Sequence, residues 1–134
     1  MISIYTDGSC LNNPGPGGWA ILGIERKKIT KISGGEANTT NNRMELIAVI
    51  EALRYYKEYN KYIIHTDSKL TINCAEGKWK RKKNLDLWEE YDSVSKYKMI
   101  VYKWVKGHSG NKNNEIVDKL ARKAAQKVYK KNIS

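Results

Sequence analysis

Long hydrophobic runs are absent from this chain. No apolar stretch approaches the roughly 20 residues that a membrane-spanning helix needs, and the first residues lead straight into a strand-like pattern. We therefore expect no secretory signal, no membrane anchor and no membrane partner. Cysteine is scarce too, because Cys10 and Cys74 stand alone, without the paired spacing of a disulfide framework or a zinc site. Reduced thiols are typical of an intracellular protein, so we expect a cytoplasmic location.

The chain also lacks internal repeats, linkers and low-complexity segments, so nothing in it supports a second domain. We expect one domain over residues 1–134. A chain of this length buries about two-thirds of its unfolded surface around a single core. Hydrophobic residues make up 40% and charged residues 29%, which is typical of an ordinary globular protein.

Acidic residues are few beside the basic ones. The chain has 14 Asp and Glu against 25 Lys and Arg, which gives a formal net charge of +11 and a pI near 9.6. Such a chain favours polyanions, nucleic acid first and an acidic membrane surface second, unless the charge serves only solubility. The cations are also clustered, since KWKRKK at residues 78–83 places five of them around Trp79, and residues 119–134 hold six and no acid.

The pattern of apolar residues predicts a mixed sheet covered by helices. Three strand-like segments separated by turn-rich sequence come first and indicate an antiparallel meander, after which helices and strands alternate. Asn42, with Glu45 three residues on, resembles a capping arrangement at the start of the first helix. The expected strands are 1–6, 18–24, 28–34, 62–66 and 99–105, and the expected helices are 40–59, 69–76, 85–96 and 114–131.

Acidic side chains stand at motif-like positions in separate segments. Asp7 and Asp67 each end a strand, and parallel neighbouring strands would bring these two carboxylates together at one sheet edge. Glu45 lies in the first turns of the first helix, close to its buried face, and Asp118 flanks the apolar stripe of the last helix. Each acid alone is more often a cap, a turn residue or a surface charge. Their joint occurrence favours a common site.

Carboxylates held together need a cation among them, because like charges raise one another's pKa. Oxygen ligands select hard ions, so we expect Mg²⁺, with Mn²⁺ as a substitute, rather than zinc or copper. Two such ions about 4 Å apart can activate a water and stabilise the leaving oxygen of a phosphodiester. The acids therefore predict metal-dependent phosphodiester chemistry.

Histidine occurs at two positions with different expected roles. His108 lies in a glycine-flanked loop ten residues before Asp118, where it is suited to carry a proton to or from the reacting groups. A hydrogen-bonded loop histidine without a catalytic task is the alternative. His65 lies inside a strand, and we expect a structural role for it.

Five segments together resemble type 1 ribonuclease H, in the order in which that family carries them. They are YTDGSCLNNPGPGGWA, TTNNRMELIAVIEAL, HTDSK, NLDLWE and WVKGHSGNKNNEIVDKLAR, and the similarity runs from residue 2 to about 125. The resemblance implies the ribonuclease H-like fold, an α/β architecture whose five-stranded mixed sheet has three antiparallel strands, then two parallel ones, and helices on both faces. It also implies a two-metal-ion endonuclease that hydrolyses the RNA strand of RNA–DNA hybrids to 5′-phosphate and 3′-hydroxyl products.

The same resemblance implies roles for individual residues. His108 matches a loop histidine that assists proton transfer or product release, and Glu115 matches an accessory acid sometimes involved there. Lys69 stands where the family uses glutamine, and Asn38 where an arginine often completes a pocket for a DNA phosphate. The acids that match its catalytic metal ligands are Asp7, Glu45, Asp67 and Asp118. The implied contacts to the hybrid are Asn13, Thr40, Asn41, Lys69 and Asn84.

Many bacterial members of the family carry an extra helix and a long basic loop that grip the hybrid, whereas this chain has only GKWKRKKN at residues 77–84. We expect this handle to be truncated to a basic turn, with affinity that depends strongly on salt. Trp79 either lies against the DNA strand or packs over the preceding helix. The expected contacts of the turn are Trp79, Lys80, Arg81, Lys82 and Lys83.

Other functions are weighed against this one. A nuclease of the same fold for junctions or double-stranded RNA is disfavoured by TTNNRMEL, which supplies implied hybrid contacts as well as an acid. A catalytically inactive hybrid-binding module is disfavoured because all four acids are present. Glycoside hydrolysis needs a carboxylate pair rather than four acids and gains nothing from positive charge. The favoured interpretation is a monomeric RNA–DNA hybrid endonuclease.

Overall fold

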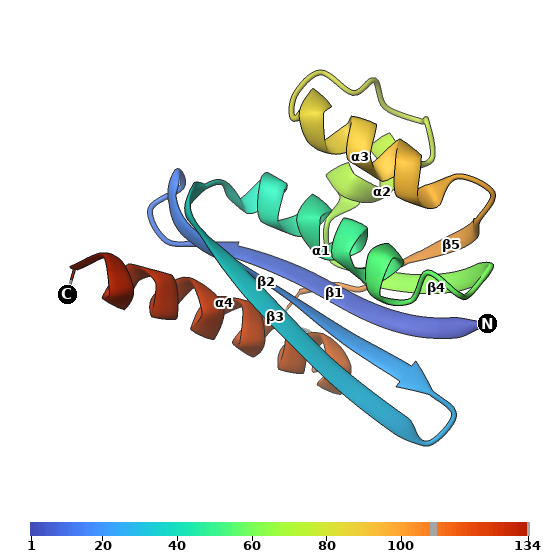
Figure 1. The fold of residues 1–134 in the computed structure, drawn as a ribbon, viewed down its shortest axis with the longest axis horizontal. Coiled ribbons are helices and arrows are strands. Elements are labelled where there is room, and N and C mark those ends of the chain that lie inside the picture. Colours follow the sequence, from blue (N-terminus) through green and yellow to red (C-terminus); the bar gives the residue numbers. More distant parts are fainter. Residues whose placement is uncertain (108–109, 134) are drawn as a thin grey trace.

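The structure is a computed structural model that describes residues 1–107 and 110–133. Its strands are β1 (Ile2–Cys10), β2 (Gly15–Glu25), β3 (Lys28–Thr39), β4 (Lys61–Thr66) and β5 (Met99–Trp104). They form one sheet in the order β3-β2-β1-β4-β5 (Figure 1). β1 with β2, and β2 with β3, pair antiparallel, whereas β1 with β4, and β4 with β5, pair parallel. The expected mixed sheet is confirmed.

Helices cover both faces of this sheet. They are α1 (Asn41–Tyr55), α2 (Lys69–Ala75), α3 (Leu85–Ser95) and α4 (Lys112–Ile133). Figure 1 shows α1, α2 and α3 on one side and α4 alone on the other. No helix in the described part of the chain is long and apolar enough to cross a membrane.

The alternating directions of the side chains along β1 explain how the sheet contributes to a hydrophobic core on each of its two faces. Ile2 and Ile4 are buried in the core under α1 and α3, while Tyr5 packs with the smaller core under α4. Successive residues of a strand point to opposite faces, so one strand contributes to both. The predicted apolar face of α1 is buried and consists of Leu46, Val49, Ile50, Leu53 and Tyr56.

Small residues let α4 lie very close to the sheet. Ala121 and Ala125 are fully buried on its inner face. A Cβ atom at Gly18 of β2 would lie 2.3 Å from the carbonyl oxygen of Ala121, so only glycine fits beneath this turn. The close contact fixes α4, which carries Asp118, against β2 and β1.

Several sequence expectations change in detail. β2 and β3 are longer than the expected strands 18–24 and 28–34, and α1 ends at Tyr55 rather than at residue 59. β1 continues past Thr6 to Cys10, because its second half pairs with β2, so Asp7 lies inside the strand rather than at its end. The predicted cap at Asn42 is wrong: Thr40 caps α1, and its Oγ1 accepts a hydrogen bond from the backbone N–H of Arg43.

Other expectations are confirmed. His65 is structural, since its ring stacks on Tyr5 at 4.1 Å and its Nε2 lies 3.1 Å from the hydroxyl of Ser3. Both cysteines, Cys10 and Cys74, are free.

Candidate active site

Three carboxylates meet where β1 separates from β4. One oxygen each of Asp7, Glu45 and Asp67 lies within 4.8 Å of the others. They come from β1, from the fifth residue of α1 and from the residue after β4. The structure thus brings together three of the four acids that the sequence proposed as a common site.

Strand pairing places the two aspartates. β1 pairs in parallel with β4 only as far as Tyr5 and His65, and the chains then diverge. Asp7 lies two residues beyond this point in β1, and Asp67 two residues beyond it after β4. Their carboxylates therefore lie at the edge where the parallel pair opens, the position in which α/β sheets place ligands.

Gly8 lets Glu45 join them. A Cβ atom at this position would lie 2.4 Å from the backbone nitrogen of Glu45 and 2.4 Å from the carbonyl carbon of Met44. Such a distance is a severe overlap with backbone, so the first turn of α1 reaches β1 only because residue 8 has no side chain. The glycine in the segment YTDGSC therefore serves the site directly.

The electrostatics of the cluster are unfavourable without a cation. Burial, and then the charge of Asp67, raises the pKa of Asp7 to about 7. Burial, and then the charge of Asp7, raises the pKa of Glu45 well above its usual value. Oε1 of Glu45 is buried and has no hydrogen-bond partner in the described part of the protein. These features fit a cation bound among the three carboxylates.

Asp118 lies close to this cluster but outside it. Its Oδ2 lies 3.0 Å from Nη2 of Arg122, one turn further along α4. Its charge still contributes, as the weakest of the causes, to the raised pKa of Asp7. Glu115 is exposed and lines a surface hollow of about 310 Å³ together with Asp118.

The loop after β5 passes beside Asp67. A Cβ atom at Gly107 would lie 3.1 Å from Oδ2 of that residue. His108, the expected proton carrier, follows directly and lies outside the described residues. Gly107 is therefore the last described residue of this loop before His108, and it lies next to the carboxylate of Asp67.

Two asparagine amides near the cluster have their acceptor atoms occupied. Oδ1 of Asn13 accepts a hydrogen bond from the backbone N–H of Asn41 at 2.9 Å, and Oδ1 of Asn84 accepts one from Nη1 of Arg43 at 3.2 Å. Each amide therefore offers its NH₂ group, a double donor, to a neighbouring molecule. Sequence reasoning missed Arg43, although it lies within the segment TTNNRMEL.

Lys69 begins α2 and lies beside Asp67. Its ammonium lies 4.3 Å from the centre of the Trp104 ring, and Nε1 of Trp104 donates to the backbone oxygen of Asp67 at 3.2 Å. A cation–π contact of this kind holds the lysine side chain in place. Sequence reasoning missed Trp104, whose only signal was its place at the end of the last strand.

Comparison with known proteins decides the family. A family model described as RNase H matches residues 1–126, nearly the whole chain. The chain belongs to the RNase H family. A ribonuclease H of Campylobacter jejuni (serotype O:23/36, strain 81-176) is 50% identical, with 98% of this chain and 95% of that protein covered. A ribonuclease H of Treponema denticola is 42% identical, with 95% of this chain and 98% of that protein covered.

A solved structure shares the fold of this RNase H. It is LC11-RNase H1 in complex with an RNA/DNA hybrid, with a TM-score of 0.84, 23% identity and coverage of 96% of this chain and 99% of that one. At this identity the likeness shows the fold alone. The family assignment makes the chain a ribonuclease H enzyme of type 1, and its sheet order and helices are those expected of that fold.

In this RNase H the expected handle is a short connection between α2 and α3. Gly77, with φ of 76°, ends α2 in the left-handed region that favours glycine, and residues 78–83 follow as an exposed turn. We call residues 78–83 the basic turn. The Trp79 side chain is 49% exposed, so it is largely available to a ligand. The turn borders a hollow of about 220 Å³ whose other wall includes Asn42 and Leu46 of α1.

The cations of the basic turn are not equivalent. Lys80, Lys82 and Lys83 are exposed, and no ion pair to them occurs among the described residues. Arg81 instead bonds to Asp92 of α3, with Nη1 at 2.8 Å from Oδ1 and 2.9 Å from Oδ2. The expectation of a phosphate contact thus suits the lysines better than Arg81.

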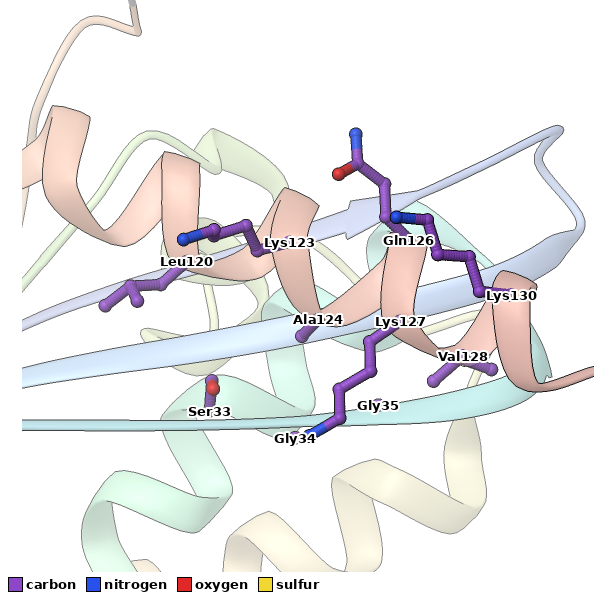
Figure 2. Close-up of a pocket in the computed structure, with 10 residues that line it drawn as sticks. All are labelled: Ser33, Gly34, Gly35, Leu120, Lys123, Ala124, Gln126, Lys127, Val128 and Lys130. Atoms are coloured by element: carbon purple, nitrogen blue, oxygen red, sulfur yellow. The ribbon is translucent and has the colours of Figure 1, made fainter.

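A second cationic surface lies on the opposite side of the sheet. A hollow of about 610 Å³ separates α4 from β3, and Figure 2 shows Lys127 reaching across it toward Gly34. Lys123 and Lys130 line the same hollow, which contains none of the cluster acids. This surface is therefore distinct from the active site of this RNase H.

Proposed function

We propose that this RNase H hydrolyses the RNA strand of RNA–DNA hybrids, endonucleolytically, to 5′-phosphate and 3′-hydroxyl products. The observation that carries the proposal is the cluster of Asp7, Glu45 and Asp67 in a chain that matches the RNase H family over nearly its whole length. A protein of the same fold has been captured with an RNA/DNA hybrid, which supports this choice of substrate.

We propose Mg²⁺ as the cofactor, with Mn²⁺ as a substitute, held by Asp7, Glu45, Asp67 and Asp118. All four offer only oxygen ligands, which hard divalent ions prefer. Two such ions supply an activated water and charge stabilisation at the leaving oxygen of the phosphodiester. An ion bound there would compete with protons, because the pKa values of Asp7 and Glu45 are raised by burial and by the neighbouring carboxylates.

Substrate contacts are proposed around this centre. The NH₂ groups of Asn13 and Asn84 have no hydrogen-bond partner among the described residues and can donate to sugar, base or phosphate oxygens. Thr40 lies beside them at the start of α1, although its Oγ1 already caps the helix. Lys69 places a positive charge next to Asp67, where we expect it to contact the RNA strand. Asn41 completes the set through its side chain, since its backbone N–H is bonded to Asn13.

His108 is proposed as the group that moves a proton or assists product release. The course of the loop at Gly107, next to Asp67, supports this role. Glu115, exposed on the first turn of α4, is proposed as an accessory acid at the same edge. We further propose that the chain acts as a monomeric catalytic domain over residues 1–134. Its two free thiols support a cytoplasmic location.

The test is cleavage of labelled nucleic acids by the purified protein with Mg²⁺, Mn²⁺ or EDTA. We expect cleavage of the RNA strand of a hybrid with either metal, and none of duplex DNA, duplex RNA or single strands. Cleavage that persists in EDTA contradicts the metal assignment. Preference for a junction or for duplex RNA points to another nuclease of this fold, and hybrid binding without cleavage points to an inactive binding module.

A further inference from the structure

Arg81 makes several contacts although it lies in an exposed turn. Its guanidinium bonds to both carboxylate oxygens of Asp92 and lies 4.3 Å from the centre of the Trp88 ring and 5.6 Å from that of Tyr91. Its Nε donates to the backbone oxygen of Cys74 at 3.1 Å. Trp88 and Tyr91 are themselves nearly fully buried, so this side chain covers the edge of the core.

These contacts join three parts of the fold. Cys74 lies in the last turn of α2, where the helix dipole favours a cation that bonds to a carbonyl oxygen. Trp88, Tyr91 and Asp92 belong to α3. Arg81 therefore ties the middle of the basic turn to the helix before it and to the helix after it.

The two ends of the connection are held as well. The backbone N–H groups of Lys78 and Trp79 both donate to the carbonyl oxygen of Asn73 in α2. At the other end, Arg43 of α1 forms a two-point bridge to Asp86, at 3.0 and 2.8 Å. The lysines of the turn are thus carried by a backbone that is held at its beginning, middle and end.

We propose that Arg81 is a positioning residue that sets the shape of the basic turn, so that Lys80, Lys82 and Lys83 face the phosphates of the bound hybrid. This inference rests on the proposed function. In this proposal Nε and Nη1 are not phosphate contacts, because they bond to Cys74 and Asp92.

Preorganisation is the physical reason for the effect. A loose turn would lose backbone and side-chain freedom when its lysines bind phosphates, and that loss would weaken binding. A turn that Arg81 already holds in place has less conformational freedom to lose when it binds. The arginine is suited to the task because its planar group stacks on aromatic rings while Nη1 bonds to Asp92 and Nε bonds to the carbonyl oxygen of Cys74. A lysine has a single nitrogen and no planar group, so it cannot make all these contacts at once.

Asp92→Asn separates positioning from charge. The substitution removes a negative charge near the basic turn, so electrostatics alone predicts a lower KM for hybrid. If Arg81 acts by position, loosening its partner raises KM instead, by about two- to fivefold, with kcat unchanged. Glu89→Gln is the matched control, since it removes the same charge from an exposed residue of α3 that has no ion pair among the described residues.

Arg81 variants provide the second measurement. Arg81→Met is expected to raise KM by about tenfold while kcat at saturation holds, and Arg81→Lys is expected not to restore binding. The double variant with Asp92→Asn should bind no more weakly than Arg81→Met alone, because both changes remove one interaction. Thermal unfolding of each variant establishes that the comparison is made on folded protein.

The outcomes are distinct. A KM that is raised in Asp92→Asn but not in Glu89→Gln supports the proposal. A KM that falls equally in both, full rescue by Arg81→Lys, or a lower Tm with unchanged KM in the Arg81 variants overturns it. Absence of hybrid cleavage by the unsubstituted protein overturns the proposed function instead, so the two failures are told apart.

Discussion

The carboxylate cluster and the basic turn are built in opposite ways. The cluster joins residues from three distant segments, held by buried strands and by one glycine contact, and its charges repel one another. The basic turn is continuous in sequence, exposed to solvent, and held at its surface by arginine contacts. The first arrangement suits interactions with a reacting centre, and the second suits attraction of remote phosphates. Changes in the cluster should therefore act on kcat, and changes in the turn on KM.

The largest effect is expected from removing a cluster charge. Asp7→Asn or Asp67→Asn should lower kcat for hybrid by about a thousandfold or more, because each removes a proposed metal ligand, which would contribute several kcal/mol at the reacting phosphate. The metal-free variants should be at least as stable as the unsubstituted protein, since each substitution relieves repulsion within the cluster. Steady-state kinetics and thermal unfolding in EDTA measure the two quantities.

Glu58→Gln provides the control for this comparison. Glu58 is an exposed carboxylate just past α1, so its loss should leave kcat unchanged. An Asp7→Asn protein that is inactive because it does not fold would contradict the argument, as would one that retains normal cleavage.

The next effect concerns the glycine contact that assembles the cluster. Gly8→Ala should lower kcat by about a hundredfold, because the added methyl pushes the first turn of α1, and with it Glu45, away from Asp7. Gly23→Ala is the matched control: its Cβ would lie 2.0 Å from the hydroxyl of Tyr56, beyond the other end of α1. That variant should lose stability and keep kcat. Equal losses of kcat in the two variants would show a general loss of folding rather than a local displacement.

Gly8 also shows where sequence reasoning stops. The alternation of Ile2, Ile4 and Thr6 predicted a strand, and glycine is a poor strand residue, so the strand was expected to end there. The structure continues β1 to Cys10 because β2 supplies hydrogen-bond partners that a local pattern does not contain. The proximity of Asp7 and Asp67 was predicted from the ends of the strands. The role of Gly8 could not be predicted in this way, because it depends on how closely α1 packs against β1.

The arginines teach the same lesson for the surface. A run of cations in sequence suggests one uniform patch, yet Arg81 pairs with Asp92, eleven residues away, whereas Lys80, Lys82 and Lys83 have no ion pair within the part of the chain that the structure describes. The partner of Arg43 lies 43 residues away in α3. Such pairs depend on how helices pack, which propensity and spacing do not specify. The sequence motifs identified the residues of the candidate site. The tertiary contacts then distinguish Arg43 and Arg81, which form ion pairs, from the exposed lysines of the basic turn.

The third prediction concerns pH in the absence of metal. The pKa of Asp7 is raised to about 7 in the folded protein and lies near its usual value of 3.8 when unfolded, so the folded state binds the proton more tightly. The stability of the metal-free protein should therefore be highest near pH 4 and fall as pH rises toward 7, and Asp7→Asn should flatten this dependence. Urea unfolding in EDTA between pH 4 and 8 tests the sign. Stability that rises over this interval through the Asp7 contribution would contradict the assigned pKa shift.

The smallest effect is expected from the lysines of the basic turn. Replacing Lys80, Lys82 and Lys83 with glutamine should raise KM for hybrid by about tenfold and leave kcat nearly intact, because cations that bind remote phosphates stabilise ground state and transition state alike. The slope of log KM against log salt should fall by about one unit for each phosphate that the protein no longer neutralises. Hybrid cleavage measured across a salt series gives both quantities.

The matched control removes the same number of charges from the other side of the sheet. Lys123, Lys127 and Lys130 line the hollow between α4 and β3, and their replacement with glutamine should leave KM and the salt slope close to their original values (Figure 2). If KM rises in this variant but not in the basic-turn variant, the lysines of α4 rather than those of the basic turn bind the hybrid. A fall in kcat alone in the basic-turn variant would contradict the proposal that either surface binds remote phosphates. It would instead place these lysines at the reacting phosphate.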